Sequence, residues 1–169
     1  LPKIADRLAG MPAQLAILGN GESALERQMA DMARRRPGTF AATIGFDESL
    51  AHRIEAGADV FLMPSRYEPC GLNQMYSLRY GTPPVVREVG GLADTVMDAS
   101  AHALQSGTAT GFVFRQPLAG EFLSATRRAM TLWYDQRAWQ GVQLTAMGQD
   151  FSWQRSAECY LELYRSATE

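Results

Sequence analysis

The sequence has two cysteines, no long hydrophobic run and almost no net charge, and each of these excludes a class of protein. Cys70 and Cys159 are too few for a disulfide-bonded scaffold, and they favour a reducing compartment, so a cytoplasmic location is expected. No apolar stretch approaches the ~18 residues that a membrane span needs. The 16 basic and 18 acidic residues give a net charge of −2, which argues against a protein that binds nucleic acid by neutralising phosphates.

Apolar residues are abundant: they make up 46% of the 169 residues, enough for one compact domain with a real core. The chain contains no internal repeat, low-complexity tract or obvious linker, so a single domain over residues 1–169 is expected, with a helical tail over residues 135–169. It begins Leu1-Pro2-Lys3, without an initiator methionine or a basic-then-apolar leader. We therefore expect a fragment, truncated at its N-terminus.

Strand-like and helix-like stretches alternate along the chain. Apolar runs predict strands at residues 14–19, 39–44, 59–63, 84–87 and 111–114. Helical periodicity predicts helices at residues 22–36, 48–56, 71–80 and 118–133, and a last helix capped by Ser152. Apolar strands separated by helices indicate a parallel sheet covered on both faces. The predicted fold is therefore α/β, a doubly wound, Rossmann-like sheet that binds ligands at the carboxyl ends of its strands.

A glycine turn, Gly19-Asn20-Gly21, follows the first predicted strand and opens a helix. Such a turn can approach a phosphate, which makes Gly19 a weak candidate for nucleotide binding. However, Ala24 stands where a dinucleotide fingerprint has its third glycine. A tight strand-to-helix turn without a ligand is therefore the favoured interpretation.

The segment that follows the buried strand at residues 59–63 is more informative. A loop over residues 64–70 leads into a helix that begins at Gly71, where a Rossmann-like sheet binds its ligand. The N–H groups of Gly71, Leu72 and Asn73 are the unpaired donors of a helix N-terminus and can bind an anion. Glu68 lies just before them. Its carboxylate either contacts a group such as a sugar hydroxyl or favours the helix dipole from outside, and the pattern leaves both interpretations open.

Other reactive or aromatic residues favour structural roles. His52 and His102 stand alone, so no metal site and no cofactor are expected. Cys159 lies among the apolar residues of the last helix and is expected in the core. Core packing is likewise the expected role of residues at helical spacing, namely Met29, Met32, Met75, Trp133, Trp139 and Trp153.

Several motifs together resemble bacterial glycogen synthases and plant starch synthases, which are retaining glucosyltransferases of the two-domain GT-B fold. The core of the resemblance lies in residues 64–74 (PSRYEPCGLNQ), 79–86 (RYGTPPVV) and 90–96 (GGLADTV). It extends to residues 44–48 (IGFDE), 110–114 (TGFVF) and 151–153 (FSW), so it covers nearly the whole chain. Related transferases often carry a second glutamate eight positions after the first. Tyr76 stands there, which is the glycogen and starch synthase pattern and favours ADP-glucose as donor.

The resemblance implies roles for individual residues. Glu68 contacts the donor glucose and is needed for transfer, and Cys70 lies near the sugar. Backbone amides of Gly71, Leu72 and Asn73 hold the diphosphate, although the family often has threonine where Asn73 stands. Phe46 stands where the family often has tyrosine, so the ring that stacks beside adenine is kept and the hydroxyl is lost.

The family also carries an arginine and a lysine on a loop at the start of its C-terminal domain, and Lys3 does not match that motif. The chain is therefore expected to be the greater part of a C-terminal GT-B domain, with the N-terminal domain missing. As part of a longer enzyme, it would transfer glucose from ADP-glucose to an α-1,4-glucan such as glycogen. Alternatively, it is a catalytically incomplete nucleotide-binding or interaction module, or part of a GT-B transferase for another sugar nucleotide. The isolated chain is expected to be inactive.

Overall fold

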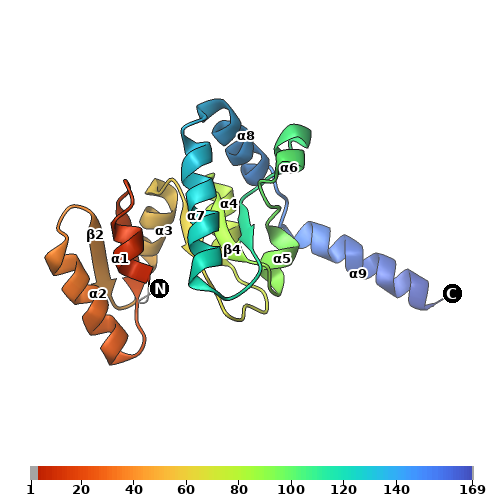
Figure 1. Cartoon of the computed structure of the whole chain (residues 1–169). Coiled ribbons are helices and arrows are strands. Elements are labelled where there is room, and N and C mark those ends of the chain that lie inside the picture. The colour runs from red at the N-terminus through yellow and green to blue at the C-terminus, as the bar shows by residue number, and fades with distance from the viewer. Residues whose placement is uncertain (1–3, 169) are drawn as a thin grey trace.

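The computed structural model describes residues 4–168, so Lys3 lies outside the described residues (Figure 1). The strands are β1 (Leu15–Gly19), β2 (Phe40–Ile44), β3 (Phe61–Met63), β4 (Pro84–Arg87) and β5 (Phe112–Phe114). The helices are α1 (Ala5–Ala9), α2 (Ser23–Arg35), α3 (Glu48–Gly57), α4 (Asn73–Tyr80), α5 (Gly91–Thr95), α6 (Ala101–Ser106), α7 (Ala119–Trp133), α8 (Gln136–Met147) and α9 (Trp153–Ala167). Within this part of the chain, no helix combines the length and hydropathy needed to cross a membrane.

All the strand pairs are parallel, as the sequence predicts, but the strands form two sheets. β1 pairs with β2, and β4 lies between β3 and β5. In Figure 1 the β1–β2 unit, with α1 and α2, stands beside the larger unit that contains β4, α7 and α8. The expected α/β architecture is therefore present, with a division between β1 and β3.

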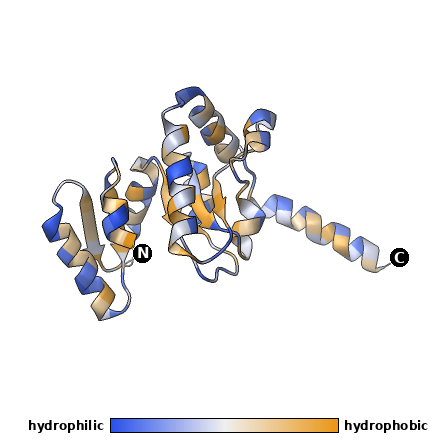
Figure 2. Ribbon diagram, viewed as in Figure 1, coloured by the Kyte–Doolittle hydropathy of each residue, from blue (hydrophilic) through white to orange (hydrophobic). Residues whose placement is uncertain are grey.

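The three-stranded sheet is covered on both faces. Successive side chains of β4 point to opposite faces, and both faces are packed. Val85 is fully buried among residues of α7 and α8, including Phe122, Leu123 and Trp139. Its neighbour Val86 is also fully buried but packs on the opposite face, in a cluster with residues of α4 and α5. The central strands are correspondingly the most hydrophobic ribbons in Figure 2.

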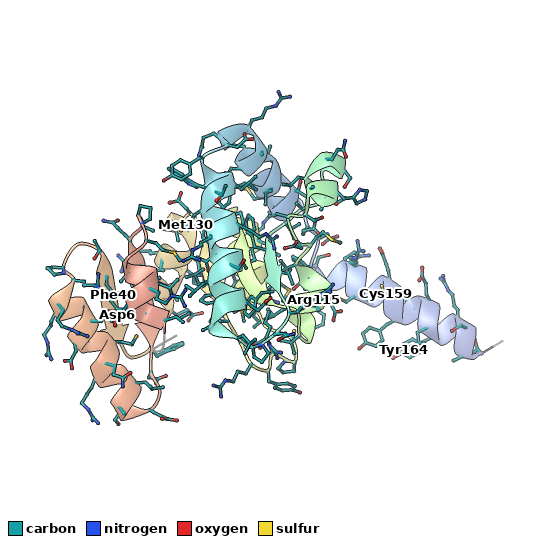
Figure 3. All side chains as sticks on the ribbon, in the orientation of Figure 1. Asp6, Phe40, Arg115, Met130, Cys159 and Tyr164 are labelled. Atoms are coloured by element: carbon teal, nitrogen blue, oxygen red, sulfur yellow. The ribbon has the colours of Figure 1, made fainter. Side chains whose placement is uncertain are left out.

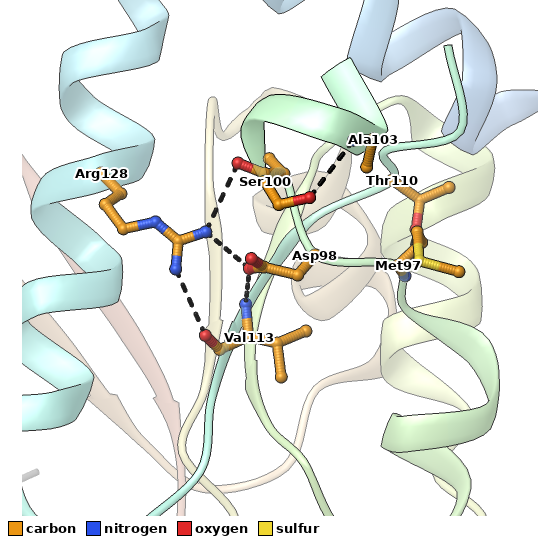
Figure 4. Close-up of polar contacts among 8 residues, drawn as sticks. Met97, Asp98, Ser100, Ala103, Thr110, Val113 and Arg128 are labelled. Carbon is orange, nitrogen blue, oxygen red and sulfur yellow. Dashed lines mark hydrogen bonds and ion pairs between the residues drawn. The ribbon is translucent and has the colours of Figure 1, made fainter. Parts of the chain in front are cut away.

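An ion pair fastens α7 to the segment that precedes α6 (Figure 4). Arg128 donates to Asp98 Oδ1 at 2.6 Å, and the same oxygen accepts from the Val113 N–H at 2.7 Å. The Arg128 guanidinium also lies 5.8 Å from the centre of the Phe112 ring. A half-exposed pair contributes little alone, but this one also satisfies a backbone donor of β5.

The two C-terminal helices differ in packing. In α8, Trp139, Val142 and Ala146 are buried against the larger unit. By contrast, α9 buries none of its described residues and projects away from the rest of the chain (Figures 1 and 3). The expectation of a core position for Cys159 is therefore wrong, since its side chain is exposed, and Trp153 is 88% exposed. The helical stripe is present, but no described element covers it.

Candidate functional site

The candidate site is built where β3 ends. The chain leaves Met63, forms the loop over residues 64–72 and enters α4 at Asn73, with Leu72 as the N-cap. Gly71 thus lies two residues before the helix, close to its predicted place. Its φ of +74° lies in the left-handed region, which favours a residue without a Cβ.

Glu68 lies within this loop, half-buried, at the carboxyl end of the sheet. Its Oε2 accepts a hydrogen bond from Ser65 Oγ at 3.3 Å. Its backbone carbonyl accepts from the Gly91 N–H at 3.2 Å, which ties the loop to the first residue of α5. The backbone at Glu68 is therefore anchored, and its carboxylate keeps lone pairs for a further donor.

Arg87, the last residue of β4, is hydrogen-bonded to the backbone of the loop. Its Nε donates to the Ser65 carbonyl at 3.0 Å, and its guanidinium also bonds the Arg66 carbonyl. A rigid guanidinium fork that holds two consecutive carbonyls fixes the direction in which the loop leaves β3. The sequence pattern did not single out Arg87, because its contacts are 21 and 22 residues away along the chain.

Two glycines allow the loop to lie close to α5. A Cβ built on Gly90 would overlap the Glu68 carbonyl oxygen, and one built on Gly91 would overlap the Cys70 carbonyl oxygen. Gly90 also has a φ of +48°. The resemblance includes this pair, and the structure shows its role: it permits the backbone of α5 to approach the loop closely at Glu68 and Cys70.

Gln74 completes the support from within α4. Its side chain is fully buried, and its Nε2 donates to the Cys70 carbonyl at 3.1 Å, the Gly71 carbonyl at 2.9 Å and Thr95 Oγ1 at 3.3 Å. Thr95 in turn donates to the Gly91 carbonyl at 2.6 Å. One buried amide therefore fixes two carbonyls that precede the helix, and so holds the backbone that carries the N–H groups of the helix N-terminus.

These N–H groups are the unpaired donors expected at a helix N-terminus that can bind an anion. Among residues 4–168, no hydrogen bond uses the N–H of Gly71, Leu72 or Asn73. The helix dipole adds partial positive charge at this end of α4. The structure thus brings together Glu68, Cys70 and the three donors within six consecutive residues. The Cys70 thiol is exposed, and its Sγ lies 3.6 Å from the Gly71 carbonyl oxygen.

The remaining predicted residues lie on the other unit. Phe46 follows β2, and its ring is 88% exposed. Gly19 ends β1, and the Gly21 N–H donates to Glu26 Oε1 at 2.9 Å, so a carboxylate of α2 already occupies one donor of this turn. That contact favours the strand-to-helix turn as the role of the glycines. Within the described part of the chain, no group of histidine, cysteine and carboxylate side chains could hold a metal ion.

The strand, loop and helix N-terminus lie at the carboxyl ends of the strands, the edge at which parallel α/β folds bind their ligands. Over residues 3–140 the sequence matches the family described as Glycosyl transferases group 1, and the chain belongs to that family. It is 54% identical over 166 residues to a glycogen synthase from Nitrosospira multiformis, covering 98% of this chain and 34% of that protein. It is 58% identical over 153 residues to a glycogen synthase from Anaeromyxobacter dehalogenans, covering 90% of this chain and 31% of that protein. The chain thus spans about one third of these relatives' length.

Solved structures agree with the sequence comparison. The chain is similar to the catalytic domain of starch synthase IV from Arabidopsis thaliana, solved with ADP and acarbose, with a TM-score of 0.72 and 26% identity over 99% of this chain and 42% of that one. The glycosyltransferase WaaG gives a TM-score of 0.59 at 21% identity, covering 88% of this chain and 39% of that one. This likeness shows the fold alone. The prediction of an α/β fold of the GT-B type and the resemblance to glycogen and starch synthases are confirmed.

Proposed function

We propose that the chain forms most of the donor site of an ADP-glucose:α-1,4-glucan glucosyltransferase that extends glycogen with retention of configuration. The observation that carries the proposal is the Glu68 carboxylate, bonded to Ser65 in the loop that leads directly to the three free N–H groups of Gly71, Leu72 and Asn73. The similarity to proteins named glycogen synthase, and to a starch synthase domain solved with ADP, supports the choice of donor and acceptor.

The three N–H groups bind the donor diphosphate in this proposal. Departure of the leaving group moves negative charge onto the diphosphate oxygens. Donors that are already oriented stabilise that charge without reorganising during the reaction. Gln74 and the Gly90–Gly91 pair do not contact the donor, but they fix the backbone that presents the N–H groups.

Glu68 and Cys70 act on the glucose side of the donor. A carboxylate beside a diphosphate is unfavourable unless it meets a donor group, and glucose hydroxyls supply such groups. Phe46 stacks on adenine and presents an exposed ring for it. Tyr76, eight residues after Glu68, leaves that position without the second carboxylate found in many related transferases.

The acceptor glucan is assigned to the rest of the protein. Because the chain spans about one third of its curated relatives, we place the contacts to glycogen and the remaining catalytic groups in an N-terminal domain of the same cytoplasmic polypeptide. Closing that domain over the loop at Glu68 would bring donor and acceptor together.

The test is Glu68→Gln in the gene product that contains residues 1–169. Transfer of labelled glucose from ADP-glucose to glycogen should fall by ~10²–10³-fold, by analogy with the removal of one stabilising group from an active site. Affinity for ADP, measured by calorimetry, should change little, because backbone amides and the Phe46 ring hold the nucleotide.

Glu88→Gln is the matched control. Glu88 follows β4 at the same edge of the sheet and pairs with Arg115 at 2.8 Å, so this change removes the same charge from a neighbouring position. Its turnover should stay close to that of the unmodified protein. Near-normal turnover of the Glu68 variant, or faster transfer from UDP-glucose than from ADP-glucose, would overturn the assignment of the residue or of the donor.

A further inference from the structure

The carboxylate of Glu68 is restrained by a single side chain. Among residues 4–168, its one hydrogen-bond partner is the hydroxyl of Ser65, whose Oγ lies 3.3 Å from Oε2. Both residues are half-buried in the loop over residues 64–72. A glutamate side chain has several rotatable bonds, so a carboxylate without such a partner samples several rotamers. The Ser65 hydroxyl therefore selects among the positions that the carboxylate can take.

Ser65 is itself held at both of its backbone polar groups. Its N–H donates to the carbonyl of Met63, the last residue of β3, at 2.9 Å. Its carbonyl accepts from Arg87 Nε at 3.0 Å, and the same guanidinium bonds the next carbonyl, that of Arg66. A side chain on a backbone fixed in this way presents its hydroxyl from a defined point. The ends of β3 and β4 thus jointly place the donor that meets the Glu68 carboxylate.

The contact uses only one of the two carboxylate oxygens. An ionised carboxylate is an acceptor at both oxygens and can bond several donors at once. While Oε2 of Glu68 is bonded to Ser65, Oε1 has no hydrogen-bond partner among the described residues. The two oxygens belong to one planar group, so the contact at Oε2 also restricts where Oε1 lies. Under the proposed function, a glucose hydroxyl is the donor that Oε1 meets.

We propose that Ser65 is a positioning residue for glucose transfer: its hydroxyl orients the Glu68 carboxylate toward the donor sugar, and Arg87 holds Ser65 in place. The inference rests on the proposed function of Glu68. In this role Ser65 acts through Glu68 and not on the substrate. Phe46 and the amides of residues 71–73, which hold the nucleotide in the proposed function, take no part in it.

The test is Ser65→Ala in the gene product that contains residues 1–169. The kcat for transfer from ADP-glucose to glycogen should fall by ~10–100-fold, because misplacing a reacting group by ~1 Å can cost ~100-fold. The Kd for ADP, measured by calorimetry, should not change. Ser65→Thr keeps the hydroxyl and should retain most of the turnover. Ser106→Ala, the matched control, removes a hydroxyl that bonds the Ala103 carbonyl in α6 and should leave kcat as it is.

A double variant separates the orientation of Glu68 from a purely structural role. In Glu68→Gln the carboxylate that Ser65 orients is gone, so adding Ser65→Ala should cause no further loss of turnover. An additional loss in that background, or weaker ADP binding by Ser65→Ala alone, would show that Ser65 supports the loop as a whole and would overturn the proposal. Normal turnover of Ser65→Ala beside a slow Glu68→Gln would overturn this inference alone. Normal turnover of Glu68→Gln would overturn the role of Glu68 and this inference with it.

Discussion

Gly91 restricts the position of the loop over residues 64–72. A Cβ at this position would overlap the Cys70 carbonyl oxygen, a backbone atom that cannot move aside alone. Gly91→Ala should therefore lower the free energy of unfolding by ~1–3 kcal/mol, the usual cost of overpacking. It should also weaken ADP binding, because the loop before Gly71 must shift. Urea denaturation and calorimetry measure the two effects.

Gly141→Ala in α8 is the matched control for that change. No atom lies within 4 Å of a Cβ at Gly141, and the residue is exposed in the interior of a helix. Alanine is favoured over glycine there, so this variant should gain up to ~1 kcal/mol. An equal gain for Gly91→Ala would show that the contact with Cys70 does not restrict the loop.

Glu55 illustrates a different residue-scale effect, a carboxyl group buried without a hydrogen bond. Glu55 in α3 is 4% exposed, its Oε2 has no hydrogen-bond partner among the described residues, and His52 Nδ1 lies 3.7 Å from that oxygen. Burial raises the pKa of Glu55 above its ordinary value of 4.5, and the charge of His52 partly opposes this. The folded protein then binds the proton more tightly than the unfolded chain. Stability should fall as pH rises from about 4.5 through the raised pKa.

Glu55→Gln should remove this pH dependence. The slope that it removes is at most ~1.4 kcal/mol per pH unit. The urea midpoint of the variant should therefore rise relative to that of the unmodified protein when the pH is raised from 4 to 8. Glu48→Gln, an exposed change in the same helix, should leave the slope as it is. If both variants keep the slope of the unmodified protein, Glu55 is not its origin.

At the scale of the element, the sequence pattern located the five strands and the helices α2, α3, α4, α7 and α9, but it did not predict α5 or α6. It also could not show what packs on each element. The stripe of α9 was correctly predicted, yet Trp153 and Cys159 are exposed, because burial needs a partner surface that no stripe specifies. β3 was predicted as a buried strand over residues 59–63, but it spans Phe61–Met63 and is only half-buried, because its outer edge has no pairing strand among the described residues.

The residues of the candidate site also fall into those that the local sequence predicts and those that it does not. Glu68 and the N–H groups after it could be predicted, because a buried strand, a loop and a helix follow one another directly in the sequence. Arg87, Gln74 and Thr95 could not, because their roles come from contacts across the fold. Only the glycines at residues 90–91 gave a local signal, since adjacent glycines often mark a close backbone approach.

At the scale of the whole molecule, residues 1–169 alone should not transfer glucose. Under the proposed function, the acceptor half of the active site lies elsewhere in the polypeptide, and holding two substrates together is worth ~7–11 kcal/mol of barrier in favourable cases. ADP should still bind weakly, through Phe46 and the amides of residues 71–73. The measurement is incorporation of label from ADP-glucose into glycogen, with the complete gene product as the positive control.

Incorporation by residues 1–169 at a rate comparable to that of the gene product would contradict this expectation. The acceptor site and the groups that stabilise the leaving diphosphate would then lie within the chain itself. Retained ADP binding without transfer would agree with the proposal, since it separates the donor site from catalysis.

The division between β1 and β3 also governs how the chain behaves in concentrated solution. Unpaired strand edges are templates on which other chains pair, and natural proteins keep them covered or charged. Here the edges of β1 and β3 that pair with no described strand face a largely apolar cleft and carry Ala16, Leu18 and Leu62. A polypeptide that leaves them uncovered therefore presents a site for intermolecular β-pairing. Aggregation, with its secondary structure still intact, is consequently the failure to expect when this chain is produced alone.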